Sequence, residues 1–109
     1  MPLVRPRITT KSDFVTMEFQ LPSVDPRSFL VEVSGDRVYI LGRYAADVRG
    51  LPFAIYPQSG SKLKGDFNIP APVSSDVRYL EASYSDDVLY LRLRRADEYP
   101  ERTIKLYVR

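Results

Sequence analysis

The chain has 109 residues, of which 44 % are apolar and 28 % are charged. This length suits one domain with a modest core, and the apolar share indicates a globular chain rather than a disordered one. Lys and Arg number 16 against 14 Asp and Glu, so the net charge of +2 does not by itself indicate a polyanionic partner. No window approaches the length of about 18 apolar residues that a membrane-spanning helix needs, and we expect no membrane partner.

Cysteine and histidine are both absent from the sequence. A disulfide framework and a thiolate metal site are therefore excluded, and the usual general base at neutral pH is missing. We accordingly expect no enzymatic activity, no bound metal and no other cofactor. Because the first residues also lack the apolar run of a signal peptide, the sequence favours a cytoplasmic protein.

Apolar and polar residues alternate along most of the chain, which is typical of strands with one buried face. The first half has such strands over residues 15–21, 29–33 and 37–41. The tight turn Ser34-Gly35-Asp36-Arg37 would join the last two. The best helical candidate is a single turn at Asp25-Pro26-Arg27-Ser28, where Pro occupies a first-turn position.

The second half of the chain has the same organisation. Strands are expected over residues 63–69, 79–83 and 89–94, with Ser85-Asp86-Asp87 as the second tight turn. The dipeptide Ile69-Pro70 ends the first of these strands, as Leu21-Pro22 does in the first half, because Pro cannot continue a central strand. The pattern predicts an all-β fold, an immunoglobulin-like antiparallel β-sandwich of seven to nine strands.

Two segments lie outside this regular pattern. Residues 44–60 form a long connection that holds the apolar island Phe53-Ala54-Ile55-Tyr56. It either folds back over its own core or serves as an arm, with Phe53, Ile55 and Tyr56, that adds a strand to the sheet edge of a partner. At the other end, a polar linker leads to residues 103–109, which are either another sandwich strand or a detached strand that docks in a groove of this chain or of a neighbour.

Five short segments, by their order and spacing, resemble the α-crystallin domain of the small heat-shock proteins, the Hsp20 family. They are Leu21-Pro22-Ser23-Val24-Asp25, Val38-Tyr39-Ile40-Leu41-Gly42-Arg43, Phe67-Asn68-Ile69-Pro70, Ala82-Ser83-Tyr84-Ser85-Asp86-Asp87-Val88-Leu89 and the near match Ile104-Lys105-Leu106 to the family's Ile-x-Ile/Val motif. The resemblance implies a short N-terminal extension over 1–6, the sandwich domain over 7–95, and a linker with an Ile-x-Leu tail over 96–109.

The chain departs from the family pattern at several positions. Asp87 and Ser23 stand where the family has Gly, and Asp tolerates the left-handed conformation that such a turn needs. Gly65 stands where many members have an Arg that helps the dimer interface. The family's long apolar N-terminal arm has no counterpart in the short segment before the first strand, which predicts a homodimer or small homo-oligomer.

The resemblance implies an ATP-independent chaperone that binds unfolded or destabilised client proteins and prevents their aggregation. No nucleotide-binding Gly-x-x-x-x-Gly-Lys-Ser/Thr loop is present. By the resemblance, a binding groove lies between strands 29–33 and 79–83. Its lining would be Val31, Val33, Leu80 and Ala82, and the tail residues Ile104 and Leu106 would fill it. The four lining residues are also those that an ordinary sandwich core would contain.

Three other functions are compatible with the residues. The first is a protein–protein interaction or co-chaperone module on the same fold, without general chaperone activity. The second is nucleic-acid binding through Tyr90, Arg92, Arg94 and Arg95, although these residues also suit the solvated face of a strand, and we expect no nucleic-acid partner. The third is acid–base chemistry at Asp86-Asp87, for which an exposed turn is the simpler interpretation.

Overall fold

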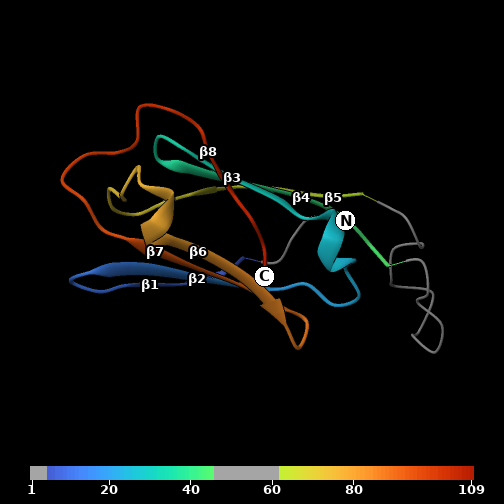
Figure 1. Cartoon of the computed structure of the whole chain (residues 1–109). Helices are drawn as coiled ribbons and strands as arrows, with labels where there is room; N and C mark the ends of the chain where they lie inside the picture. Colours follow the sequence, from blue (N-terminus) through green and yellow to red (C-terminus); the bar gives the residue numbers. More distant parts are fainter. Residues whose placement is uncertain (1–4, 46–61) are drawn as a thin grey trace.

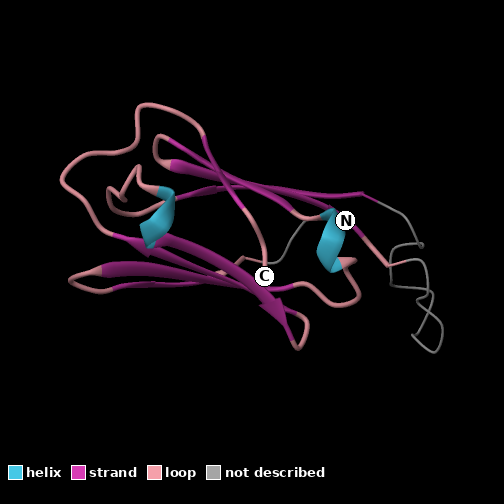
Figure 2. Cartoon of the chain, viewed as in Figure 1, coloured by secondary structure: helices cyan, strands magenta, loops and turns pink. Residues whose placement is uncertain are grey.

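The computed structural model describes residues 5–45 and 62–109. This part of the chain forms two four-stranded antiparallel sheets that face one another (Figures 1 and 2). In sheet order, the first contains β1 (Arg7–Thr10), β2 (Phe14–Gln20), β7 (Val88–Arg94) and β6 (Leu80–Ser85), and the second contains β5 (Lys62–Asn68), β4 (Arg37–Arg43), β3 (Leu30–Ser34) and β8 (Ile104–Leu106). The predicted antiparallel β-sandwich is therefore confirmed.

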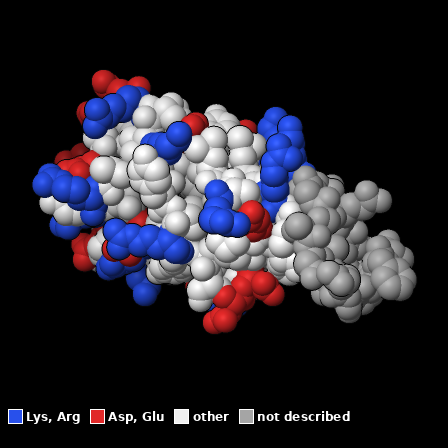
Figure 3. Space-filling view, turned by 45° about the vertical axis from the view of Figure 1, so that its right-hand side comes forward, with Lys and Arg blue, Asp and Glu red and all other residues white. Residues whose placement is uncertain are grey.

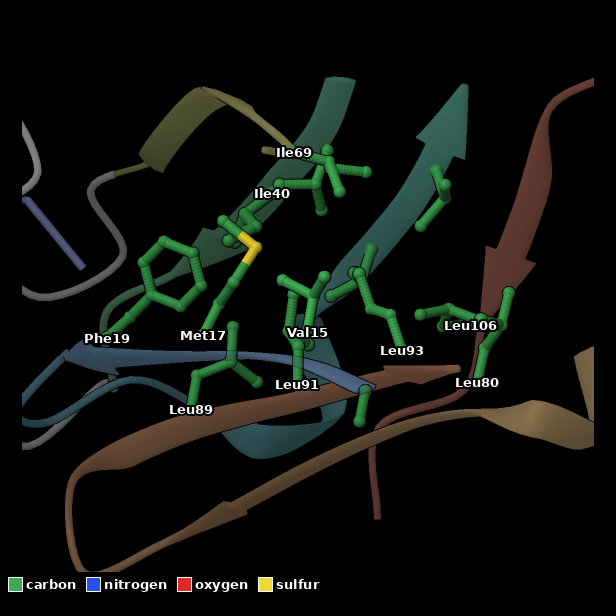
Figure 4. Packing of buried hydrophobic residues seen from close by; sticks show 14 of the residues in the cluster. Val15, Met17, Phe19, Ile40, Ile69, Leu80, Leu89, Leu91, Leu93 and Leu106 are labelled. Carbon is green, nitrogen blue, oxygen red and sulfur yellow. The ribbon is translucent and has the colours of Figure 1, made fainter. Parts of the chain in front are cut away.

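The core lies between the two sheets and is built by the predicted alternation. In β2 and β7 every second residue is fully buried, and the intervening residues are at least partly exposed. Figure 4 shows the inward side chains of β2 and β7 meeting Ile40 and Ile69 from the other layer. Burying one such Val, Leu or Ile side chain contributes about 1.5–3 kcal/mol. Among the described residues, none of the buried ones is polar or charged, so the core is held by apolar packing.

Both predicted hairpin turns are present. The β3–β4 turn places Gly35 at φ +57°, and the β6–β7 turn places Asp86 at φ +52° and Asp87 at φ +66°. The two positive φ angles of the β6–β7 loop are the signature of a type I′ turn, whose twist matches that of the strands it joins. The expectation that Asp87 takes the place of a turn Gly is thus confirmed, and Ser23 also lies in the left-handed region at φ +61°.

Two short 3₁₀ turns complete the described part of the chain, η1 (Pro26–Ser28) and η2 (Val77–Tyr79). The carboxylate of Asp25 accepts from the backbone N–H of Arg27 at 3.0 Å, so η1 confirms the predicted helical turn. The prediction that Tyr79 lies in a strand is wrong: Tyr79 ends η2, and β6 begins at Leu80. Neither turn approaches the length or apolar character that a membrane-spanning helix requires, and the described residues contain no other helix.

Candidate binding groove

The tail strand β8 lies along the edge of β3. The two strands are antiparallel, and their register places Leu106 opposite Val31 and Ile104 opposite Val33. In Figure 1 the chain after β7 arches over the end of the sandwich, descends as β8, and ends between the two layers. The tail of the chain therefore adds the last strand to its own second sheet.

Beyond β8, the tail leaves the second sheet and contacts the first. Val108 forms a parallel bridge with Ala82 of β6. The backbone N–H of Arg109 donates to the carbonyl oxygen of Ala82 at 3.0 Å, and the N–H of Tyr84 donates to the carbonyl oxygen of Arg109 at 2.8 Å. The tail thus pairs with β3 in the second sheet and with β6, an edge strand of the first, and covers the opening between them.

Burial separates the two faces of the tail. Ile104 is 6 % exposed and Leu106 is 2 % exposed, whereas Tyr107 is 82 % exposed. In Figure 4 the side chain of Leu106 lies beside that of Leu80, and both residues line the same hollow. The predicted lining residues Val31, Val33, Leu80 and Ala82 and the predicted tail residues Ile104 and Leu106 all belong to one buried cluster. Their role in binding a client protein stays a prediction.

Tyr84, which was not among the predicted site residues, supports the groove from the side of β6. Its hydroxyl donates to the carbonyl oxygen of Leu21 at 2.5 Å and accepts from the N–H of Val24 at 3.3 Å. Its ring packs against that of Phe29 with 5.0 Å between the centroids. Burial raises the pKa of the Tyr84 hydroxyl above its usual 10.0. The strand whose backbone receives the end of the tail is therefore fixed to the turn that precedes η1.

The η2 turn borders the other side of the tail. The carboxylate of Asp76 accepts from the backbone N–H of Arg78 at 3.0 Å and forms an ion pair with its guanidinium at 2.7 Å. The hydrogen bond from the Arg78 side chain is the main reason why the pKa of Asp76 is lowered to about 2. Asp76 and the tail residues Lys105 and Tyr107 line one open hollow, so this ion pair sits directly beside the docked strand.

The arginines considered for nucleic-acid binding are engaged within the protein. The Arg92 guanidinium lies 3.7 Å from the centroid of the Phe14 ring and 3.9 Å from a carboxylate oxygen of Glu81. Arg94 lies over the ring of Tyr79 at 5.0 Å. On the face shown in Figure 3, basic and acidic side chains are interspersed and separated by uncharged surface. These contacts favour the interpretation of β7 as a solvated strand face with mixed charge.

The remaining candidate residues fall into three groups. Asp86 and Asp87 form the exposed tip of the β6–β7 hairpin, and the described residues contain no group of three or more His, Cys, Asp or Glu side chains that could hold a metal ion. Gly65 lies in β5 opposite Ile40. Phe53, Ile55 and Tyr56, the predicted dimer arm, lie outside the described residues.

The chain is similar to known proteins in structure rather than in sequence. No family model matches the sequence, and no curated protein matches it. Among solved structures, HSP18.5 from E. histolytica is similar with a TM-score of 0.69 and 17 % identity, covering 87 % of this chain and 88 % of that one. Heat shock protein 16.0 from Schizosaccharomyces pombe is similar with a TM-score of 0.63 and 20 % identity, covering 91 % of this chain and 94 % of that one.

A small heat-shock protein from Xylella fastidiosa is also similar, with a TM-score of 0.61 and 22 % identity over 90 % of this chain and 91 % of that one. These similarities place the chain in the class of two-layer antiparallel sandwiches. More specifically, the chain has the α-crystallin domain fold of the small heat-shock proteins.

Proposed function

We propose that the protein is an ATP-independent molecular chaperone that holds extended apolar segments of destabilised proteins in the groove between β3 and β6. The observation that carries the proposal is the pairing of the tail with β3, in which Ile104 and Leu106 are buried opposite Val33 and Val31. An extended segment with apolar residues two positions apart already occupies the groove, so a client segment with the same pattern would fit it.

The free energy of tail docking is compatible with a tail that binds the groove reversibly. Burying the side chains of Ile104 and Leu106 contributes about 3–6 kcal/mol gross, from which the ordering of the tail and linker must be subtracted. The net value is small enough for the tail to leave and for another segment to enter. We infer that client binding requires the tail to be displaced and that no nucleotide is consumed in the exchange.

The fold also supports self-association into a homodimer or small oligomer. Within the described residues, β1 and β5 are the outer strands of the two sheets, opposite the edges that the tail covers. All four residues of β1 are exposed. An outer strand with unpaired backbone groups can accept a strand from another copy of the chain.

A light-scattering assay with a heat-labile client enzyme tests the proposal. We expect the protein to reduce scattering at several-fold molar excess over the client, and to do so better when Ile104 and Leu106 are both replaced by Ser so that the groove is open. If neither the native protein nor the open variant reduces scattering, the chaperone function is wrong.

The occupied groove also favours a second candidate, a dedicated interaction module. A groove that the chain's own tail covers would admit only a partner able to displace that tail, rather than any unfolded chain. Capture of a single defined partner, together with no effect on several unrelated heat-labile clients, would select this function over general chaperone activity.

A further inference from the structure

The linker that carries the tail to its groove leaves the domain after Ala96, whose backbone N–H donates to the carbonyl oxygen of Pro72 at 3.0 Å. Beyond it, residues 97–98 and 101–103 are exposed. In Figure 1 this stretch forms a wide arch between β7 and β8. A hollow of about 920 Å³ lies between the linker and the segment at Ser74 and Ser75. A flexible linker of this length leaves many conformations open to the tail unless a contact with the domain holds the linker at some point.

Two adjacent residues fix the arch near its middle. The Tyr99 hydroxyl donates to the carbonyl oxygen of Ile69 at 3.1 Å, and Pro100 is buried although the residues on either side of it are exposed. Ile69 is itself fully buried in the core, so the acceptor belongs to a rigid part of the domain. Pro100 additionally fixes its own φ and disfavours the helical conformation at Tyr99, which reduces the number of conformations that the linker can adopt at this point.

We propose that Tyr99 and Pro100 form a latch that directs the tail onto the groove of its own chain. Once the latch is closed, only residues 101–103 separate it from β8, and the Thr103 hydroxyl contacts that of Ser34 at 3.2 Å where the tail meets β3. A tether this short keeps the tail near its own groove at a high effective concentration. The inference rests on the proposed groove and adds what controls access to it.

The latch changes the apparent affinity of the groove for any other segment. A segment from outside binds only the fraction of molecules whose tail is undocked, so its apparent dissociation constant is the intrinsic one divided by that fraction. Losing one neutral hydrogen bond such as that of Tyr99 is expected to raise the undocked fraction about two- to tenfold. The apparent affinity should rise by the same factor.

Hydrogen exchange on the full-length protein tests the latch, with Tyr99→Phe compared against Tyr107→Phe. The first variant removes only the hydroxyl that reaches Ile69, and the second removes the hydroxyl of a tail tyrosine that is 82 % exposed. We expect exchange at the tail amides over 104–109 to be about two- to tenfold faster in Tyr99→Phe and unchanged in Tyr107→Phe. Equal tail exchange in Tyr99→Phe and the native protein would overturn the latch.

A labelled peptide with the sequence of residues 103–109 provides the second measurement. It should bind Tyr99→Phe about two- to tenfold more tightly than the native protein or Tyr107→Phe, and equal affinities for all three would also overturn the latch. The light-scattering assay separates this result from the proposed function. Faster tail exchange and tighter peptide binding without any effect on client aggregation would retain the latch and reject the chaperone.

Discussion

Val108 lies beside Ala82 in a parallel bridge only two residues after Leu106 has paired with Val31 in the opposite sheet. The end of the chain therefore spans both layers of the sandwich at the edges that face one another. A strand in this position stabilises the two edges together, because its removal exposes apolar side chains from β3 and β6 at the same time. Stability and access to the groove should accordingly change in opposite directions.

The double substitution Ile104→Ser and Leu106→Ser tests this relationship. We expect the free energy of unfolding to fall by about 2–4 kcal/mol, because two buried side chains lose their burial and the tail no longer docks. Urea denaturation followed by circular dichroism measures the change. Lys105→Ser is the matched control, since Lys105 lies between the two residues on the exposed face of β8.

The same variants distinguish docking from ordinary core packing. If the tail is a reversible lid, the double variant should remain folded and cooperative at 25 °C while binding more of an apolar dye than the Lys105→Ser control does. A double variant that unfolds completely would show that the tail is an integral strand of the domain, which contradicts its role as a displaceable segment.

Left-handed residues in two turns offer stabilising substitutions. Ser23 at φ +61° and Asp87 at φ +66° hold a conformation that disfavours residues with a side chain by about 1–2 kcal/mol, less for Asp. Ser23→Gly and Asp87→Gly should therefore each raise the free energy of unfolding by about 0.5–1 kcal/mol, after the entropy that Gly loses on folding is subtracted.

Gly35 allows the opposite substitution, from Gly to a residue with a side chain, as a control. A Cβ atom at Gly35 would meet nothing within 4 Å, so Gly35→Ala should destabilise the protein by about 1 kcal/mol through its φ of +57° alone. Urea midpoints of the three variants, measured side by side, check the set. A loss of stability in both Gly variants would show that the native side chains of Ser23 and Asp87 stabilise their turns by more than the backbone strain.

The alternation of apolar and polar residues identified the strands that bury one face. It did not identify β1, which buries neither face. Every residue of β1 is exposed, so β1 shows no alternation, and its place is set by antiparallel pairing with β2 through backbone hydrogen bonds. The burial of Val31, Val33, Leu80 and Ala82 in one cluster was predictable because these residues follow the alternation.

Two features of the site could not be predicted from local sequence. The Tyr84 hydroxyl donates to the carbonyl oxygen of Leu21, which lies 63 positions earlier in the sequence. No short-range sequence pattern predicts such a contact. Whether the tail docks on its own chain or on a neighbour depends on the path of the linker, which the latch at Tyr99 and Pro100 sets. Long-range hydrogen bonds of this kind depend on the assembled fold rather than on residue spacing.

Removing the Tyr84 hydroxyl should weaken the brace and change the response to alkaline pH. Tyr84→Phe keeps the ring against Phe29 and is expected to destabilise the protein by about 1–2 kcal/mol, because the Leu21 carbonyl and the Val24 N–H lose their partner. Tyr39→Phe, on the exposed face of β4, should have little effect. Urea midpoints at neutral pH compare the two.

The pH dependence follows from the direction of the pKa shifts. Burial raises the pKa of Tyr84 and of Tyr44 above 10.0, so the folded state holds these protons more tightly than the unfolded state does. The stabilisation is complete below pH 10.0 and is lost as the pH rises through the folded-state pKa values. Tyr84→Phe should therefore lose less stability than the native protein in this range. An equal loss in both would assign the alkaline transition to other groups.

At acid pH, we expect the loss of stability to involve Asp76, on the other side of the groove from Tyr84. Its pKa is about 2 in the folded protein against 3.8 for an unperturbed Asp, mainly because the Arg78 side chain donates to it. The folded state thus binds this proton less tightly, and the stabilisation is present above pH 3.8 and is lost as the pH falls towards about 2. The Asp76→Asn variant should lose less stability than the native protein over this interval, as measured by urea midpoints. Arg78→Gln removes the ion pair but keeps the backbone N–H that donates to Asp76, so its acid profile should lie between those of the native protein and Asp76→Asn. A native-like acid profile in both variants would show that the ion pair beside the tail does not govern the acid response.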